Sequence, residues 1–307
     1  RLTDVTGVQT CALPIYLLVA PNPLLNLKAG VIRVPFGQYN LLYTPPYHSL
    51  GSIPLSNRHL LPVVWSEPGV SLFGKIERNF PVKLTYEAML SNGVGEKGFD
   101  SKTGNRQGKQ SLHEDNNRDK QLSGRIGVVS DFGLDVAAFY AGISGMIGRY
   151  DDRQRNEYRG LAIDYLLRVG PFTLIGDHDR LQISGEYVRF EIERDLAILQ
   201  QHPDISPSME GNYVQIEYLF FPEPWRDWKF FNRESTLGIS FRYEWVDLNR
   251  KIKGASVLDD PSSHTLGFFI RPIGQSIVRI EYGWIREFVE NRWAWNNRIL
   301  ASFATHF

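Results

Sequence analysis

Residues 237–245 read Leu-Gly-Ile-Ser-Phe-Arg-Tyr-Glu-Trp, with a large apolar or aromatic side chain at every second position. Successive side chains of a β-strand point to opposite faces, so this stretch predicts a ribbon with one apolar and one polar face. The polar face carries Arg242 and Glu244 beside Gly238 and Ser240. Such a strand needs an apolar medium on one side and water or polar groups on the other.

The same alternation recurs along most of the chain. Its apolar sets include Val70/Leu72/Ile76, Val82/Leu84/Tyr86/Ala88/Leu90, Leu122/Ile126/Val128, Leu134/Val136/Ala138/Tyr140, Leu161/Ile163/Tyr165/Leu167, Val214/Ile216/Tyr218/Phe220, Leu266/Phe268/Ile270 and Val278/Ile280/Tyr282/Trp284. About twelve strands result, many of roughly ten residues, the length that a tilted strand needs to cross a bilayer. Strands in soluble sandwiches are usually shorter. Two stretches, Leu25–Val34 and Ile183–Ile192, change phase midway and predict β-bulges.

The connections between these strands alternate between short and long, as they do in outer-membrane barrels. Tight turns are expected at Glu77–Phe80, Ser130–Gly133 and Arg271–Gln275, with longer connections of the same parity at Val169–Leu181 and Phe221–Glu234. Long polar connections are expected at Phe36–Pro68, Ser91–Lys120, Ser144–Asn156, Arg194–Glu210, Arg250–Ser262 and Val289–Asn297. The predicted fold is therefore all-β, a transmembrane antiparallel up-and-down β-barrel.

Composition narrows the functional classes. Lys plus Arg and Asp plus Glu number 34 each, so there is no basic excess for binding nucleic acid. No run of about eighteen apolar residues predicts a transmembrane helix. Aromatic residues make up 13% of the chain, and Tyr or Trp recurs near the ends of the apolar faces, as in the aromatic girdles of barrels.

The N-terminal stretch is set apart from the rest. Residues Val5–Ile15 resemble the translation of a sequencing-adapter oligonucleotide, so residues 1–15 are excluded from the fold. The single cysteine, Cys11, lies in this stretch. Residues 16–307 are expected to be an outer-membrane barrel domain that is truncated at its N-terminus and lacks some strands.

The C-terminal residues carry a family resemblance. The run Ile299, Ala301, Phe303, Thr305, Phe307 alternates to the last residue. It resembles the C-terminal assembly signal of bacterial outer-membrane proteins, with Phe303 and Phe307 as its aromatic positions. The resemblance implies a bacterial outer-membrane location and the barrel-assembly machinery as a partner.

A second resemblance concerns residues 30–40 and 60–70. The segments Gly-Val-Ile-Arg-Val-Pro-Phe-Gly-Gln-Tyr-Asn and Leu-Leu-Pro-Val-Val-Trp-Ser-Glu-Pro-Gly-Val resemble a strand-to-loop junction and the following strand of porins broadly related to the phosphate-selective group. The resemblance implies passive diffusion of ions or small polar solutes, no cofactor, no enzymatic activity and a possible homotrimer. The lysine and arginine ladder of phosphate-selective members is absent, so phosphate selectivity is not carried over.

If the apolar faces meet lipid, the polar faces line the lumen. The candidate pore-lining residues are Lys75, Lys83, Glu87, Arg125, Asp164, Glu217, Arg242, Glu244, Arg279 and Glu281. Mixed charges on a pore wall set ion preference, although cross-strand pairing that only solvates the wall is the alternative. The proline-rich loop 38–67 is expected either to fold inward as a constriction, with Arg58, His59 and Glu67 as polar groups, or to pack on the rim.

Other chemistry finds little support. Gly93–Gly98 fits G-x-G-x-x-G but no helix follows it, so dinucleotide binding is rejected. Asp177-His178-Asp179 and His113-Glu114-Asp115 are read as solvent-facing, and no metal site is expected. Two other functions are considered besides a porin: a non-conducting barrel that acts as receptor, adhesin or structural protein, and, after it, a hydrolase with its active site at the barrel rim. The alternative fold is a soluble β-sandwich.

Overall fold

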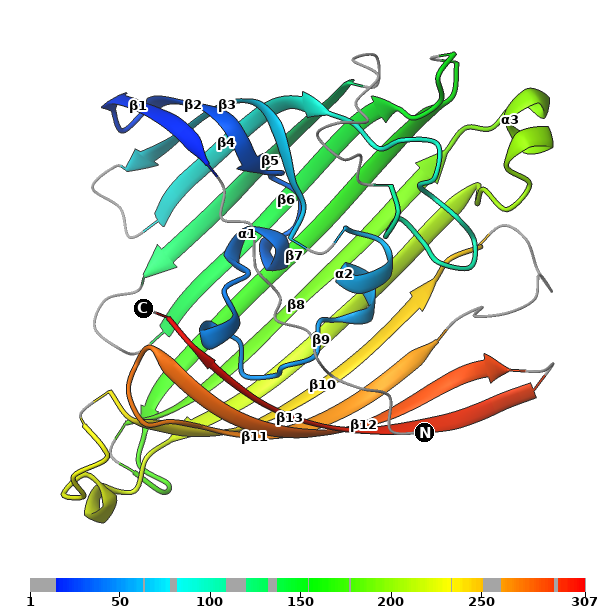
Figure 1. The fold of residues 1–307 in the computed structure, drawn as a ribbon. Helices are drawn as coiled ribbons and strands as arrows, with labels where there is room; N and C mark the ends of the chain where they lie inside the picture. Colours follow the sequence, from blue (N-terminus) through cyan, green and yellow to red (C-terminus); the bar gives the residue numbers. More distant parts are fainter. Residues whose placement is uncertain are drawn as a thin grey trace.

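The structure, a computed structural model, describes residues 15–62, 64–77, 82–108, 120–131, 137–153, 155–176, 178–232, 234–250, 261–289 and 292–306. Its strands form one thirteen-stranded sheet in which each strand pairs antiparallel with its neighbours in the chain (Figure 1). They are β1 Tyr16–Asn22, β2 Leu25–Arg33, β3 Ser66–Glu77, β4 Val82–Asn92, β5 Lys120–Asp131, β6 Ala137–Arg149, β7 Glu157–Phe172, β8 Asp179–Ile192, β9 Ser208–Phe220, β10 Thr236–Asp247, β11 Ser262–Arg271, β12 Ser276–Val289 and β13 Arg292–Thr305. The predicted up-and-down antiparallel architecture is confirmed.

The sheet curls around a concave interior but does not close. Among the described residues β1 pairs only with β2 and β13 only with β12. The described helical segments are single turns: α1 Gln38–Leu42, η1 Pro45–Tyr47, α2 Leu55–His59, α3 Leu196–Gln201 and η2 Glu223–Trp225. None of the helices in the described ranges is long and apolar enough to cross a bilayer.

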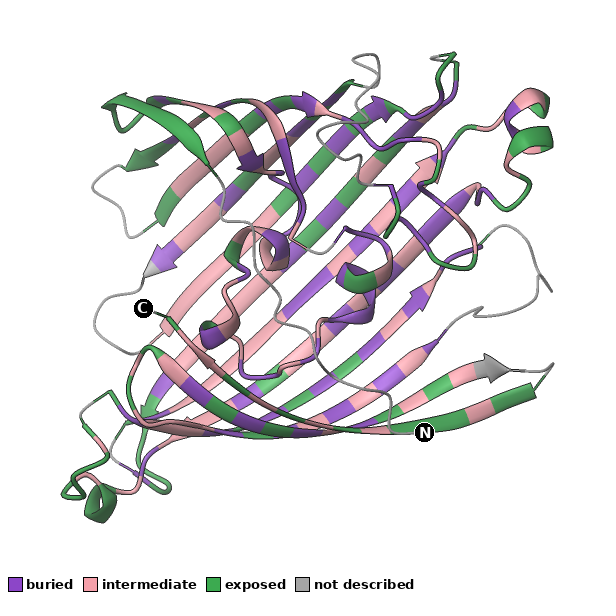
Figure 2. Ribbon diagram, in the orientation of Figure 1, coloured by how far each residue is buried: buried purple, intermediate pink, exposed green. Residues whose placement is uncertain are grey.

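The two faces of the sheet differ as the alternation predicts. On the convex face Ile143, Ile163 and Phe268 are about half exposed, at 50%, 47% and 50%. On the concave face Asp164 and Arg242 are each 1% exposed. Exposed and buried positions therefore alternate along the strands (Figure 2). The apolar face points outward, as lipid contact requires, and the charged face points inward.

Neither stretch that is predicted to bulge does so. The register shift opposite Leu25–Leu27 comes from an extra residue in β1, between Val19 and Asn22. The pairing of β2 with β3 runs without a shift from Asn26 to Arg33, and that of β8 with β9 runs without a shift from Arg180 to Glu191. The inward-facing side chains themselves change from polar to apolar along these strands: Val188 and Phe190 follow Glu186 on the same face and are fully buried. The change of phase in the sequence pattern therefore arises because different parts of the inner face pack against different groups, some polar and some apolar.

Two of the long connections predicted from the sequence are shorter in the structure. Strands β12 and β13 end and begin at Val289 and Arg292, so no long connection spans 289–297. Strand β6 continues to Arg149, well into the predicted connection Ser144–Asn156. Parts of the turns predicted at 77–80 and 130–133 lie outside the described residues.

Replacement of Ile163 by arginine is expected to destabilise the barrel in lipid by about 2–4 kcal/mol, because an arginine on the lipid face near the membrane midplane is costly. Ile163 lies in the middle part of β7 and is 47% exposed on the outer face. Val169→Arg, near the end of the same strand, is the control and should cost roughly 0–1 kcal/mol. Urea titrations of both variants in vesicles measure the difference; equal effects would contradict the assignment of the outer face to lipid.

Candidate functional site: an inward loop and the cavities beside it

The connection between β2 and β3, residues 34–65, folds into the concave side of the sheet, where α1 and α2 lie (Figure 1). We call it the inward loop. Of the two arrangements expected from the sequence, inward folding and rim packing, the structure has the first. The loop begins and ends at one place on the sheet, because Arg33 and Ser66 are a strand pair.

Carboxylates of three alternate strands hold the backbone of the inward loop. Glu186 on β8 accepts hydrogen bonds from the backbone N–H of Tyr39, at 2.9 Å, and from the amide of Asn57, at 2.7 Å. Further carboxylate contacts join Glu244 on β10 to Leu55 N, at 2.8 Å, and Glu281 on β12 to Gly51 N and Ser52 N, at 2.8 and 3.2 Å. Hydrogen bonds to charged acceptors are the stronger kind, so the loop is firmly anchored on β8, β10 and β12.

Arginines on the same side of the barrel hold loop carbonyls. Arg242 donates to the carbonyl of Ser52, at 2.9 Å, and to its hydroxyl, at 2.7 Å. The other contacts of this kind run from Arg279 to Pro45 O, at 2.9 Å, and to His48 O, and from Arg271 to Tyr47 O, at 2.9 Å. Most of these bonds go to the main chain of the loop. The path of the loop is therefore fixed by the barrel wall and depends little on the loop's own side chains.

At the opposite end from the short turns, the interior is filled by apolar side chains. Phe36, Leu60 and Trp65 of the inward loop pack with Phe99 of the β4–β5 connection and Phe190 of β8 in one buried cluster. Phe36 and Phe190 have ring centroids 5.5 Å apart, and Phe99 and Phe190 have the same separation. Part of the lumen is therefore a packed core that excludes water.

Two histidines of the loop are half-buried, and both are uncharged at neutral pH. Burial, reinforced by the charge of Arg279, lowers the pKa of His48 to about 3. Burial, with the charge of Arg58, lowers the pKa of His59 to about 4. The backbone carbonyl of His59 accepts from Asn105 N at 2.6 Å, which ties α2 to the β4–β5 connection.

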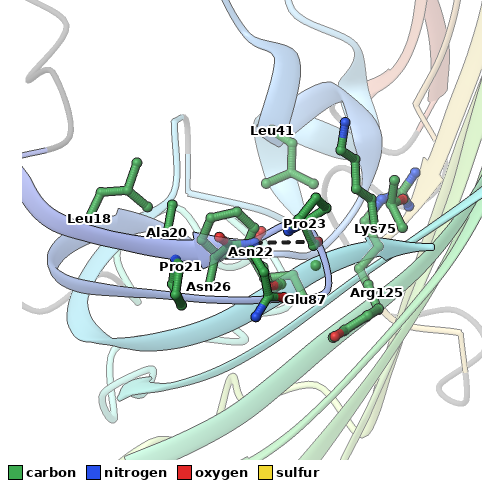
Figure 3. A pocket seen from close by; sticks show the side chains of 14 residues that line it. Leu18, Ala20, Pro21, Asn22, Pro23, Asn26, Leu41, Lys75, Glu87 and Arg125 are labelled. Atoms are coloured by element: carbon green, nitrogen blue, oxygen red, sulfur yellow. Dashed lines mark hydrogen bonds between the residues drawn. The ribbon is translucent and has the colours of Figure 1, made fainter. Parts of the chain in front are cut away.

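On the other side of the inward loop the interior contains two cavities. A cavity of about 690 Å³ lies between Leu41 of the loop and the inner face of β1–β5. Leu18, Ala20 and Pro21 lie at one side of it and Lys75 and Arg125 at the other (Figure 3). A second cavity of about 350 Å³, lined by residues of the loop and of β4–β7, shares Leu41, Thr85 and Arg125 with the first. The two adjoin along the β4–β5 wall.

The charged groups on the open side are mostly paired. Arg125 holds Asp164 through two hydrogen bonds, one of 2.7 Å. The ammonium of Lys28 lies 3.2 Å from Glu87, which also accepts from Ser71. Arg168 lines the second cavity and donates to Gln182. Charges of both signs, most of them paired, thus lie in or beside the walls of the two cavities.

The predicted pore-lining residues fall into four groups. Arg125, Asp164 and Glu87 lie at or beside the first cavity, whereas Arg242, Glu244, Arg279 and Glu281 lie buried under the inward loop. Glu217 is 5% exposed and accepts from Gln182 at 3.2 Å, away from the loop. Lys75 and Lys83 are about half exposed at the turn end, where Lys75 also lines the first cavity, and both reach Glu77, at 3.0 and 3.7 Å.

The predicted constriction and assembly residues are placed as follows. Arg58 is exposed and His59 half-buried at the end of α2. Glu67 is 1% exposed at the start of β3 and accepts from the indole of Trp65 at 3.0 Å. Phe303 is 67% exposed on the outer face of β13, and Phe307 lies outside the described residues.

Several site residues were not identified from the sequence. The most important is Glu186, which lies in the stretch read as a bulge; counting inward positions as every second residue from Gln182 would have found it. Lys28 in the other irregular stretch was missed for the same reason. Among the described residues no three His, Cys, Asp or Glu side chains come together as a metal site. His113, Glu114, Asp115 and Asp177 lie outside the described ranges.

Comparison with known proteins supports the fold. No protein-family model matches the chain. An uncharacterized protein of Aquifex aeolicus (strain VF5) is 29% identical over 73 residues, which are 24% of this chain and 16% of that protein. Among solved structures, outer-membrane expressed OmpT of Vibrio cholerae matches with a TM-score of 0.50 at 12% identity, covering 93% of this chain and 77% of that one. In-vitro folded OmpT of the same organism matches with a TM-score of 0.46, 12% identity and coverages of 94% and 84%.

The expectation that the chain is not an enzyme has to be withdrawn. Its solved structural neighbours carry the name OmpT, which is also the name of an outer-membrane protease family. At 12% identity the likeness relates folds and assigns no activity to this chain, but it removes the ground on which catalysis was excluded. The fold is established: with its thirteen-stranded antiparallel meander, outward apolar face and inward charged face, the chain has the fold of an outer-membrane β-barrel protein.

Proposed function

We propose that this protein is a porin-like channel for the passive diffusion of ions or small polar solutes, narrowed by its inward loop. The supporting observation is the asymmetry of the interior. The loop is bonded to β8–β12 on one side, and the adjoining cavities with Arg125 and Thr85 in their walls lie on the other. A loop that narrows a barrel without filling it leaves a water-filled path of mixed charge, which is what a diffusion channel requires.

The relation to the phosphate-selective porin group is part of this proposal. The relation rests on residues 30–40 and 60–70. The first segment contains the end of β2 and the start of the inward loop, and the second contains the end of the loop and the start of β3. The pairing of Arg125 with Asp164 and of Lys28 with Glu87 supports solutes of either sign more than it supports phosphate alone.

Thiol labelling of the wall tests the passage directly. In a Cys11→Ser background, Thr85→Cys places a thiol at a position that lines both cavities. A charged methanethiosulfonate reagent added to a planar bilayer is expected to reduce the current of this variant by at least about half, because it attaches a charge to the wall of a narrow pore. Ser240→Cys is the matched control: Ser240 is fully buried on β10, on the side where the loop is bonded, so its current should not change.

A non-conducting barrel with a receptor, adhesin or structural role is the second candidate. The apolar cluster of Phe36, Leu60, Trp65, Phe99 and Phe190 favours it, because this part of the interior admits no water. A silent bilayer containing correctly folded protein, with Thr85→Cys unreactive to the same reagent, would replace the channel by this candidate.

A further inference from the structure

The turn between β9 and β10 is longer and more aromatic than a connection at this end of a barrel needs to be. Residues 221–232 contain five aromatic side chains, among them two tryptophans. Trp228 is 53% exposed, Phe230 82% and Trp225 37%. We call residues 221–232 the aromatic ledge. It lies at the end of the sheet where β13 also ends, and by the rule of short inner turns this is the periplasmic end (Figure 1).

The ledge is built as a rigid unit. The rings of Trp225 and Trp228 stack with centroids 5.4 Å apart, and those of Trp228 and Phe231 stack at 6.0 Å. Phe221 is buried beneath them, with the guanidinium of Arg226 over its ring at 5.0 Å. Exposed aromatic rings held in a fixed arrangement indicate a surface made for contact and not a solvated turn.

The neighbouring turn extends the apolar surface. It joins β7 to β8, and its Leu174 and Ile175 are 78% and 53% exposed. The two turns touch, because a Cβ at Gly176 would lie 2.4 Å from the carbonyl oxygen of Phe221. Asp179 fixes this second turn by accepting from three of its backbone N–H groups.

Two features identify the medium that covers the ledge. The apolar belt of the strands runs directly into the ledge, since Phe220 ends β9 with its ring stacked on Tyr218, and its strand partner Leu237 is the second residue of β10. Arg226 and Lys229 lie between the rings; Arg226 is paired with Glu223 at 3.0 Å, so the exposed Lys229 is the cation that a headgroup meets. Tryptophan next to basic residues suits the boundary between acyl chains and phosphate groups, where the ring is half immersed and the cation reaches the headgroup.

We propose that the aromatic ledge lies in the headgroup–acyl boundary of the inner leaflet of the outer membrane and binds phospholipid there. The aromatic ledge extends the lipid contact of the barrel beyond the strand ends, and it does so only around the β9–β10 part of the barrel wall. The contact is independent of whether the interior conducts.

Site-specific fluorophores test this contact. In the Cys11→Ser background, Phe230→Cys carries an environment-sensitive label, and the protein is folded into vesicles of phosphatidylcholine and phosphatidylglycerol with or without acyl-chain bromine. Phe241→Cys, in the outer belt of β10, is the lipid-facing control, and Lys97→Cys, exposed in the β4–β5 connection, is the aqueous control.

The label at Phe230 is expected to be quenched by brominated lipid to an extent comparable with that at Phe241, and to be several-fold less accessible to iodide than that at Lys97. Trp228→Cys should give the same pattern, which guards against a local effect of one substitution. Full iodide access without bromine quenching at both positions would overturn the proposal and leave the ledge as a surface for a periplasmic protein.

Discussion

Removal of the inward loop is expected to raise the single-channel conductance several-fold. Arg33 and Ser66 are opposite each other in the β2–β3 ladder, so a four-residue hairpin containing Asn-Gly can replace residues 34–65 without moving either strand. The variant loses the loop that lies between the β8–β12 wall and the two cavities, so an ion current would have the whole interior as its path. Planar-bilayer recordings in symmetrical salt measure the change.

A milder variant separates narrowing from general damage. In the double substitution Glu244→Gln and Glu281→Gln the loop keeps its length but loses two charged acceptors for its backbone N–H groups. We expect a conductance close to that of the unmodified protein with added fluctuations, because the loop is held less tightly. If the hairpin variant folds and conducts no more than the unmodified protein, the inward loop does not set the size of the pore.

The sequence predicts the lipid-facing half of this molecule well and the interior only in part. Every outward position contacts the same medium, the lipid. Apolar residues therefore recur there at every second position, as at Ile239, Phe241 and Tyr243. Inward positions meet water, a packed loop or an apolar cluster, depending on their depth. The period therefore survives on the outer face and is lost on the inner face wherever apolar groups also point inward, as at Val188 and Phe190.

The lumen residues illustrate this limit. Their charges predicted which side of each strand faces inward, and Asp164, Arg242 and Glu281 do lie on that side. The pattern could not show that Arg242 and Glu281 are covered by the inward loop while Arg125 borders a cavity, because both arrangements need polar residues at alternate positions. Which charges meet solvent depends on where one long connection folds, and this is set by contacts far apart in the chain.

Replacement of Arg242 by methionine is expected to cost about 3–5 kcal/mol of stability, the largest effect of any single substitution proposed for this barrel. Arg242 is 1% exposed and donates both to Ser52 O and to Ser52 Oγ, and its Nε lies 3.2 Å from Glu244. Methionine has a similar length but no charge. It leaves Glu244 buried without its cation and Ser52 without two hydrogen-bond donors, and an uncompensated buried carboxylate is the main cost.

Urea unfolding in vesicles, followed by electrophoretic mobility of the folded band, measures this loss. Arg159→Met is the matched control: it also breaks an arginine–glutamate pair, with Glu157 at 2.7 Å, but the Arg159 side chain is 68% exposed and the change should cost roughly 0–1 kcal/mol. The double variant Arg242→Met and Glu244→Gln should recover part of the loss, because it removes the unpaired charge. Recovery in the double variant assigns the cost to the buried carboxylate. Equal losses in the single and double variants would instead assign it to the contacts of Arg242 with Ser52, and a loss no greater than that of Arg159→Met would mean that water reaches the space beneath the loop.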